Sequence, residues 1–168
     1  QDKLDSVKKV PYRNSCMQKV GISETSCRGI NMAIGKREVV FGLYTNLAAS
    51  PNLCSTVTYR WDQHGKERKY FQRDLSRGIA KFSPSGVVQH IVLAESPLMA
   101  LQHRESNSQA HHTFYLSTCG SLSHKITKEL STLFAKQQGI TVSLLGLNEK
   151  DTIKITDILQ KSNVPIKH

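Results

Sequence analysis

The chain has 168 residues, of which 38% are hydrophobic, and a formal net charge of +10. This length and apolar content suit a folded chain with a buried core and exclude wholesale disorder. No apolar run approaches the roughly 20 residues that a membrane-spanning helix needs, and the polar first residues lack the apolar core of a secretory signal. We therefore expect a cytoplasmic protein with no membrane partner.

The positive charge is concentrated in the first part of the chain. Residues 1–86 contain 15 Lys or Arg against 7 Asp or Glu, whereas residues 87–168 contain 8 against 6. Such an excess favours polyanionic partners, because neutralising phosphates releases condensed counterions. A basic surface that only aids solubility is the alternative.

Residues 1–86 have the pattern of a small β-rich subdomain that follows a short helical or irregular start. Three segments rich in β-branched and aromatic residues, 38–44, 54–61 and 68–73, predict strands. Asp62 to Glu67 supply turn residues between the last two, which we expect to form a β-hairpin. Turn residues also break the chain at 46–52, and Pro84 to Gly86 suit a hinge.

Residues 87–168 change to an alternation of apolar strands and amphipathic helices. Strands are expected at 87–95, 112–117 and 140–147, and a fourth is expected near 163–167. Helices are expected after Ser96-Pro97, at 121–138 and at 151–161. This order predicts an α/β fold with a parallel, Rossmann-like sheet, right-handed crossovers and helices on both faces.

Polar residues follow each of the first three expected strands. They are Glu95, the stretch from Ser117 to Gly120, and the stretch from Asn148 to Asp151. Ligand sites in parallel α/β sheets lie beyond the carboxyl ends of the strands, so we expect these clusters to meet at one edge.

The succession of an apolar strand ending in Glu, a helix, the loop "STCG" and a strand followed by "LNEKD" resembles the Toprim domain of topoisomerases and bacterial primases. The closer resemblance is to Toprim-like modules of plasmid relaxase and primase proteins, which tend to carry "ESPIDAL" where residues 95–101 are "ESPLMAL". "YRWDQHG" at 59–65 and "SRG" at 76–78 are similar to motifs in the region before those modules. The resemblance covers roughly residues 22–162 and implies a Toprim fold for 87–168.

The resemblance also implies roles for the acidic residues. Glu95 corresponds to the family's acid/base glutamate, but Asn148 and Lys150 stand where the family has the two aspartates that hold Mg²⁺. The metal-binding motif is therefore degenerate. A shift of one residue offers Glu149 and Asp151 as an acidic pair at the same spacing, and oxygen ligands of this kind suit Mg²⁺.

Two further groups of residues are candidates for nucleic-acid contact. Backbone N–H groups at Ser117, Thr118 and Gly120 could bind a phosphate at the start of a helix, although an ordinary capping loop would have the same sequence. In the hairpin region, basic residues alternate with aromatic ones, as suits single-stranded nucleic acid, and alternation on a strand would bury some of the aromatics. These basic candidates are Arg60, Lys66, Arg68, Lys69, Arg73 and Arg77.

These features together predict a Toprim-like, nucleic-acid-binding module of a mobile-element DNA-processing protein with little catalysis of its own. We expect DNA as its partner, single-stranded rather than duplex, together with a relaxase, primase or helicase. Two alternatives remain open: a Mg²⁺-dependent enzyme for nucleotidyl transfer or strand cleavage, and a protein-interaction module.

Overall fold

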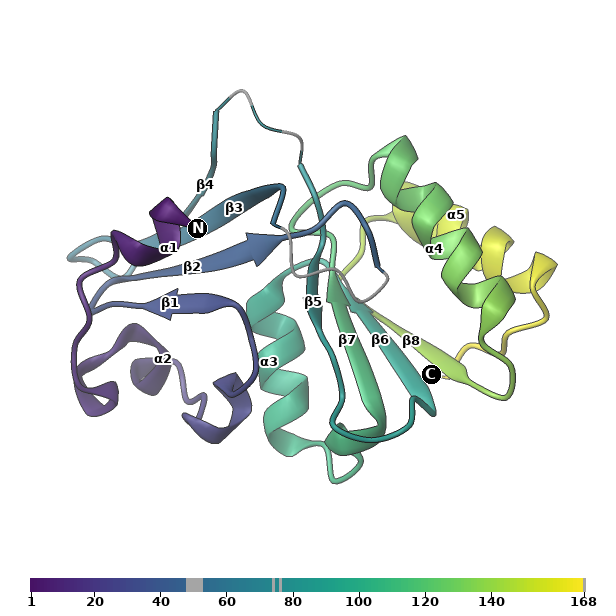
Figure 1. The fold of residues 1–168 in the computed structure, drawn as a ribbon, viewed down its shortest axis with the longest axis horizontal. Coiled ribbons are helices and arrows are strands. Elements are labelled where there is room, and N and C mark those ends of the chain that lie inside the picture. Colours follow the sequence, from purple (N-terminus) through teal and green to yellow (C-terminus); the bar gives the residue numbers. More distant parts are fainter. Residues whose placement is uncertain (48–52, 74, 76, 168) are drawn as a thin grey trace.

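The computed structural model describes residues 1–47, 53–73, 75 and 77–167. In these residues the chain forms two four-stranded sheets and three longer helices (Figure 1). The prediction of an α/β fold preceded by a β-rich region is therefore confirmed in outline. Part of the expected turn at 46–52, and Ser76 of the "SRG" motif, lie outside the described residues.

The first sheet is an antiparallel meander in the order β1-β2-β3-β4. Its strands are β1 (Met32–Ile34), β2 (Glu38–Leu43), β3 (Ser55–Trp61) and β4 (Glu67–Phe71). The predicted hairpin is confirmed as β3 and β4. Its turn is fixed locally, because the Asp62 carboxylate accepts hydrogen bonds from the backbone N–H groups of His64 and Lys66, and Gly65 takes a positive φ of 78°.

Short helical turns precede this sheet and cover parts of it. They are α1 (Asp2–Asp5), the 3-10 turn η1 (Tyr12–Asn14), α2 (Cys16–Lys19) and the 3-10 turn η2 (Thr25–Cys27). Leu4 and Val7 pack on Val40 on the outer face of the sheet, whereas Met17 and Ile22 join the large core beneath its inner face.

The second sheet has the order β5-β7-β6-β8. Its strands are β5 (Ala80–Phe82), β6 (His90–Ala94), β7 (Thr113–Ser117) and β8 (Thr141–Leu145). The last three are parallel as predicted, and Ile166 extends the sheet by one parallel bridge to Val142 where a fourth strand was expected.

The prediction of an all-parallel sheet is wrong at one edge, because β5 pairs antiparallel with β7. The short link of residues 83–89 joins β5 to β6 at one end of the sheet, and a parallel arrangement would need a longer crossover. β5 precedes residue 86, so the second sheet includes residues from the part of the chain that was assigned to the β-rich region. The division at residue 86 remains a prediction.

Helices lie on both faces of the second sheet, as predicted. α3 (Pro97–Ser106) lies on the face toward the first sheet, and α4 (His124–Lys136) and α5 (Glu149–Lys161) lie on the other face (Figure 1). Alternate residues of β6 therefore enter different cores: Val92 and Ala94 pack with α3, and Ile91 and Leu93 pack with α4 and α5. This double covering is why the strand is an unbroken apolar run.

Side chains cap each of these helices at its first turn. Ser96, Ser123 and Asn148 accept hydrogen bonds from backbone N–H groups of α3, α4 and α5 respectively. A further 3-10 turn, η3 (Ala110–His112), leads into β7. In the described parts of the chain, every helix is too short or too polar to cross a membrane.

Candidate functional site

Glu95 lies at the point where the two sheets approach each other. It follows the last residue of β6, and its backbone N–H donates to the carbonyl oxygen of Leu145 at the end of β8, with 2.9 Å between the atoms. Its side-chain oxygen lies 3.9 Å from the Nζ atom of Lys69, and both side chains are about one-third exposed, at 35% and 34%. A carboxylate at this strand end is thus paired with a cation from the other sheet.

Lys69 reaches Glu95 because of the register of the β3–β4 hairpin. Lys69 is the partner of Tyr59, and cross-strand partners point to the same side of a sheet. Tyr59 is buried in the core between the sheets, at 3% exposure, so Lys69 is also directed toward the second sheet. Its ammonium group donates to the carbonyl oxygen of Cys119 at 3.0 Å.

The loop after β7 is tightly bonded to itself. Cys119 has a φ of 55°, which is unfavourable for a residue other than glycine and is characteristic of functional or over-determined sites. The Ser117 hydroxyl accepts from the Cys119 N–H at 3.2 Å, and the Thr118 hydroxyl donates to the Gly120 carbonyl at 2.7 Å. Burial raises the pKa of Cys119 to about 11, so the thiol stays protonated near neutral pH and is a poor nucleophile.

The phosphate-binding role expected for this loop remains a prediction. The N–H groups of Thr118, Cys119 and Gly120 already donate to Ala94, Ser117 and Thr118, so a phosphate would have to displace these partners. Beside the loop lies a pocket of about 210 Å³, whose polar lining is provided by Arg77, Thr118, Ser121 and Ser123. A cation and three hydroxyl groups in one pocket suit an anion.

Arg77 also covers an aromatic ring next to Lys69. Its guanidinium carbon lies 4.1 Å from the centre of the Phe71 ring, and Lys69 Nζ lies 5.5 Å from the same centre. Phe71 is two residues from Lys69 on β4 and therefore on the same side of the strand. The arrangement places two cations and an aromatic face beside the loop, which is the combination that holds a single strand of nucleic acid.

The other predicted basic residues lie elsewhere on the hairpin. Arg60 and Arg68 are cross-strand partners on the opposite, outer side, where Arg60 pairs with Glu38 at 2.8 Å and stacks over the exposed Tyr70. Lys66 is exposed in the turn and Arg73 is exposed beyond β4. The structure thus brings only Lys69 and Arg77 of the six to the side of the hairpin that faces Glu95.

Glu149 and Asp151, the acidic pair expected to hold Mg²⁺, lie in different environments. Asp151 is buried, and its carboxylate accepts from the backbone N–H of Leu122 and from the Asn148 side chain, at 3.2 and 3.1 Å. Glu149 is exposed in the first turn of α5, which begins two residues earlier than expected.

The donor set does not fit a magnesium site as it lies. Asp151 holds the start of α5 against the loop before α4, and its oxygen is occupied by two N–H donors. Across the described ranges, no three His, Cys, Asp or Glu side chains gather as metal ligands.

One buried group where the two sheets approach each other was not anticipated from the sequence. The Tyr59 hydroxyl has no hydrogen-bond partner within the described residues, although it lies near Ser96 and Cys119. Burial raises the pKa of Tyr59 far above its usual value, so the hydroxyl is neutral. Strand alternation in the hairpin would have placed Tyr59 and Lys69 on one side, but not their neighbours from the second sheet.

Comparison with known proteins defines the fold only. No protein-family model and no curated protein matches the chain. It is similar to the primase fragment of the bacteriophage T7 primase-helicase protein, with 14% identity, coverage of 96% of this chain and 69% of the other, and a TM-score of 0.50.

A second match is to a chain in a bacteriophage T7 structure, in which the lagging-strand DNA polymerase interacts with primase domains bound to an RNA/DNA hybrid and dTTP. Here the identity is 15%, the coverage is 92% and 78%, and the TM-score is 0.50. The chain therefore has a primase-like fold, as the Toprim resemblance implied.

Proposed function

We propose that this chain is a primase-like, DNA-processing module that holds a nucleic-acid strand where β4 meets the carboxyl ends of β6 and β7. The primary support is Lys69, which extends from the first sheet to the Cys119 carbonyl and lies beside Glu95. The likeness to phage primase domains, which are bound to an RNA/DNA hybrid in one of the matched structures, supports the same class of partner.

The physical roles in this proposal are separate. Lys69 and Arg77 neutralise phosphates of the backbone, and the Phe71 face, when Arg77 moves aside, offers a stacking surface for a base. The pocket between Arg77 and the loop after β7 receives a phosphate. Glu95 repels the backbone locally and so sets the path of the strand between the cations.

Single-stranded DNA, a mobile-element context and a relaxase, primase or helicase partner are finer parts of the proposal. A single strand can bring unpaired bases to Phe71, which a duplex cannot. We propose little or no catalysis by the chain alone, because the acidic residues that the structure describes do not form a ligand set for Mg²⁺. A partner protein would then carry out the catalytic step on the bound nucleic acid.

The test is fluorescence anisotropy of the full chain with labelled single-stranded DNA, duplex DNA and RNA/DNA hybrid, at low and moderate salt, with and without Mg²⁺. We expect Lys69→Gln and Arg77→Gln each to weaken binding about 3- to 10-fold and to lower the salt slope by about one. Lys128→Gln, an exposed lysine on α4, is the matched control.

The outcomes separate the alternatives. Binding that depends on salt but not on Mg²⁺ supports the module without catalysis, whereas binding that requires Mg²⁺ favours the enzyme. If Arg60→Gln weakens binding and Lys69→Gln does not, the strand lies on the outer side of the hairpin. Absence of binding at low salt would refute the proposal for this chain and favour a protein-interaction module.

A further inference from the structure

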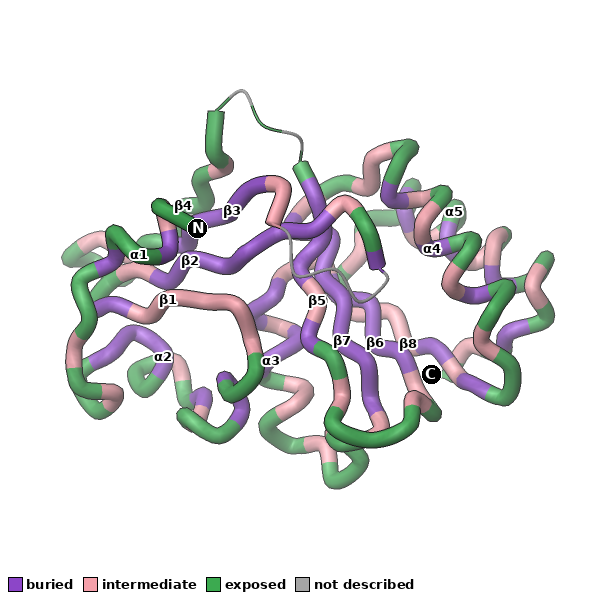
Figure 2. The backbone as a smooth tube through the Cα atoms, viewed as in Figure 1, coloured by how far each residue is buried: buried purple, intermediate pink, exposed green. Residues whose placement is uncertain are grey.

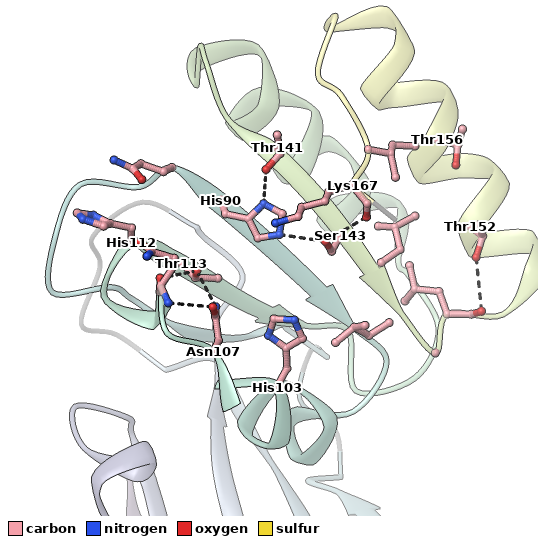
Figure 3. A pocket seen from close by; sticks show the side chains of 17 residues that line it. His90, His103, Asn107, His112, Thr113, Thr141, Ser143, Thr152, Thr156 and Lys167 are labelled. Carbon is pink, nitrogen blue, oxygen red and sulfur yellow. Dashed lines mark hydrogen bonds between the residues drawn. The ribbon is translucent and has the colours of Figure 1, made fainter. Parts of the chain in front are cut away.

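A second cavity, of about 720 Å³, lies over β8 (Figure 3). It exists because α3 packs mainly on β6 and β7, which leaves the same face of β8 open around Thr141 and Ser143. The register pairs His90 with Thr141 and Val92 with Ser143, so these side chains share that face. On this face β8 carries the hydroxyl groups of Thr141 and Ser143 beside His90, so this part of the uncovered surface is polar.

His90 is held in the cavity by two hydroxyl groups. Its Nδ1 atom contacts the Thr141 hydroxyl, and its Nε2 atom lies 3.0 Å from the Ser143 hydroxyl. The Ser143 hydroxyl donates its proton to the Lys167 carbonyl, so it must accept from Nε2–H of His90. The neutral ring therefore has its proton on Nε2, and a second proton on Nδ1 could still be shared with Thr141.

His103 faces the same cavity from α3. Its Nδ1 atom lies 2.9 Å from the hydroxyl of Tyr115, and that hydroxyl accepts a hydrogen bond from the Asn107 side chain. Tyr115 therefore donates to Nδ1, and the proton of neutral His103 is on Nε2. In the described part of the chain this Nε2 donor has no protein partner, so it is available to a ligand.

The ionisable groups around the cavity are all basic. They are His90 on β6, His103 on α3, His112 before β7 and Lys167 near the end of the chain. The lining residues that the structure describes include no Asp or Glu, and α5 contributes only the uncharged Thr152 and Thr156. Burial, and then the charge of Lys167, lower the pKa of both His90 and His103, and a bound anion would favour protonation of these rings.

We propose that this cavity binds a small phosphorylated molecule of the size of a nucleoside monophosphate or diphosphate. Its volume falls in the range of ligand sites, roughly 300–1,000 Å³, and is larger than a free phosphate needs. Lys167 and the histidines bind the phosphate, while the hydroxyl groups and the amides of Asn107 and Gln89 bind the polar body of the ligand.

The basic end of this cavity is separate from the strand-binding site proposed above, whereas its other end, at Leu145 and Gly146, adjoins Glu95. His90 begins β6 and Glu95 follows its end, a separation of five residues, or roughly 16 Å along a strand. The cavity could instead receive the terminal phosphate of a nucleic-acid strand. The size of the site favours the free small molecule, and the experiment distinguishes the two sources.

The experiment is calorimetric titration of the full chain with AMP, adenosine, sulfate and an oligonucleotide carrying a 5′-phosphate. The variants are Lys167→Gln and His103→Gln, with exposed Lys161→Gln and His124→Gln as matched controls. We expect AMP to bind, adenosine to bind at least 10-fold more weakly, and each cavity variant to weaken AMP about 3- to 10-fold. Sulfate, whose charge is constant, should compete better as pH falls from about 7.5 to 6 because the histidines gain protons.

The results that would overturn the proposal are equally specific. Equal binding of AMP and adenosine would exclude phosphate recognition, and unchanged affinity in both cavity variants would place AMP elsewhere. Lack of any AMP binding would refute the site. Tighter binding of the 5′-phosphate oligonucleotide than of AMP, lost in Lys167→Gln, would assign the cavity to a strand end instead. Lys69→Gln should leave AMP binding unchanged, which separates this site from the strand-binding site.

Discussion

Two strands of this chain, β4 and β6, have opposite burial and opposite polarity. Four of the five residues of β4 are exposed, and the strand is the edge of the first sheet, whereas β6 is central in the second sheet and is almost wholly buried (Figure 2). β4 carries Arg68, Lys69 and aromatic rings, while β6 is apolar from Ile91 to Ala94.

The difference shows how the proposed strand-binding site is divided between the sheets. The second sheet fixes the position of Glu95 and of the loop after β7 through buried, helix-covered strands. The exposed edge of the first sheet supplies cations, such as Lys69, whose ammonium group is positioned by its hydrogen bond to the Cys119 carbonyl. The accepting carbonyl of Cys119 thus belongs to the buried second sheet and its loops, and the donating ammonium group of Lys69 belongs to the exposed edge of the first sheet.

The largest expected effect is on stability, from truncation in β6. Leu93→Ala removes a fully buried side chain between the sheet and helices α4 and α5, and we expect a loss of about 2–5 kcal/mol in the free energy of unfolding. Tyr70→Ala in β4, where 46% of the residue is exposed, should cost less than about 1 kcal/mol. Urea unfolding monitored by circular dichroism measures both. Equal losses would contradict the contrast between the buried strand β6 and the exposed strand β4.

A second prediction concerns Asp151, which the structure assigns to the connection between α4 and α5. Asp151→Ala would leave the Leu122 N–H and the Asn148 amide without a buried acceptor, at a cost of about 1–3 kcal/mol. Glu149→Gln, on the exposed side of the same turn, should change the unfolding free energy by less than about 0.5 kcal/mol. An Asp151 variant of unchanged stability that loses a Mg²⁺-dependent activity would restore the metal role.

A smaller effect is expected from pH. Burial, and then the charge of Lys167, lower the pKa of His90 and His103 in the folded chain. Below the ordinary histidine pKa of about 6.5, the unfolded chain takes up protons before the folded chain does, so stability falls as pH falls from that value toward the folded-state pKa. Unfolding of the double variant His90→Gln/His103→Gln should depend less on pH over this window, whereas exposed His124→Gln should follow the original chain.

The elements that depend on local sequence were predictable, and the contacts between sheets were not. The β3–β4 hairpin, the three parallel strands and the Ser96 cap follow from short-range patterns. β5 has only three residues and gains its place from pairing with β7, which no local pattern specifies.

The site shows the same limit. Glu95 is recognisable as the polar end of an apolar strand, but its partner Lys69 depends on how two sheets pack. Asp151 did carry a local signal, since Asn148 three residues before it forms a capping pair at the start of an amphipathic helix. The hydrogen bonds of Asp151 show this structural role, and the metal role of Glu149 and Asp151 remains a prediction.

The smallest expected effect is where the two sheets meet, since the Tyr59 hydroxyl is buried there without a partner among the described residues. Tyr59→Phe keeps the ring, which packs edge-on against Phe41 with centroids 6.1 Å apart, and removes only the unpaired hydroxyl. Since burying an unpaired polar group is unfavourable, the variant should be as stable as the original chain or more stable by up to about 1 kcal/mol. A loss above that value in urea unfolding would mean that the hydroxyl bonds to Ser96 or Cys119, and that the junction is more tightly joined than its hydrogen bonds indicate.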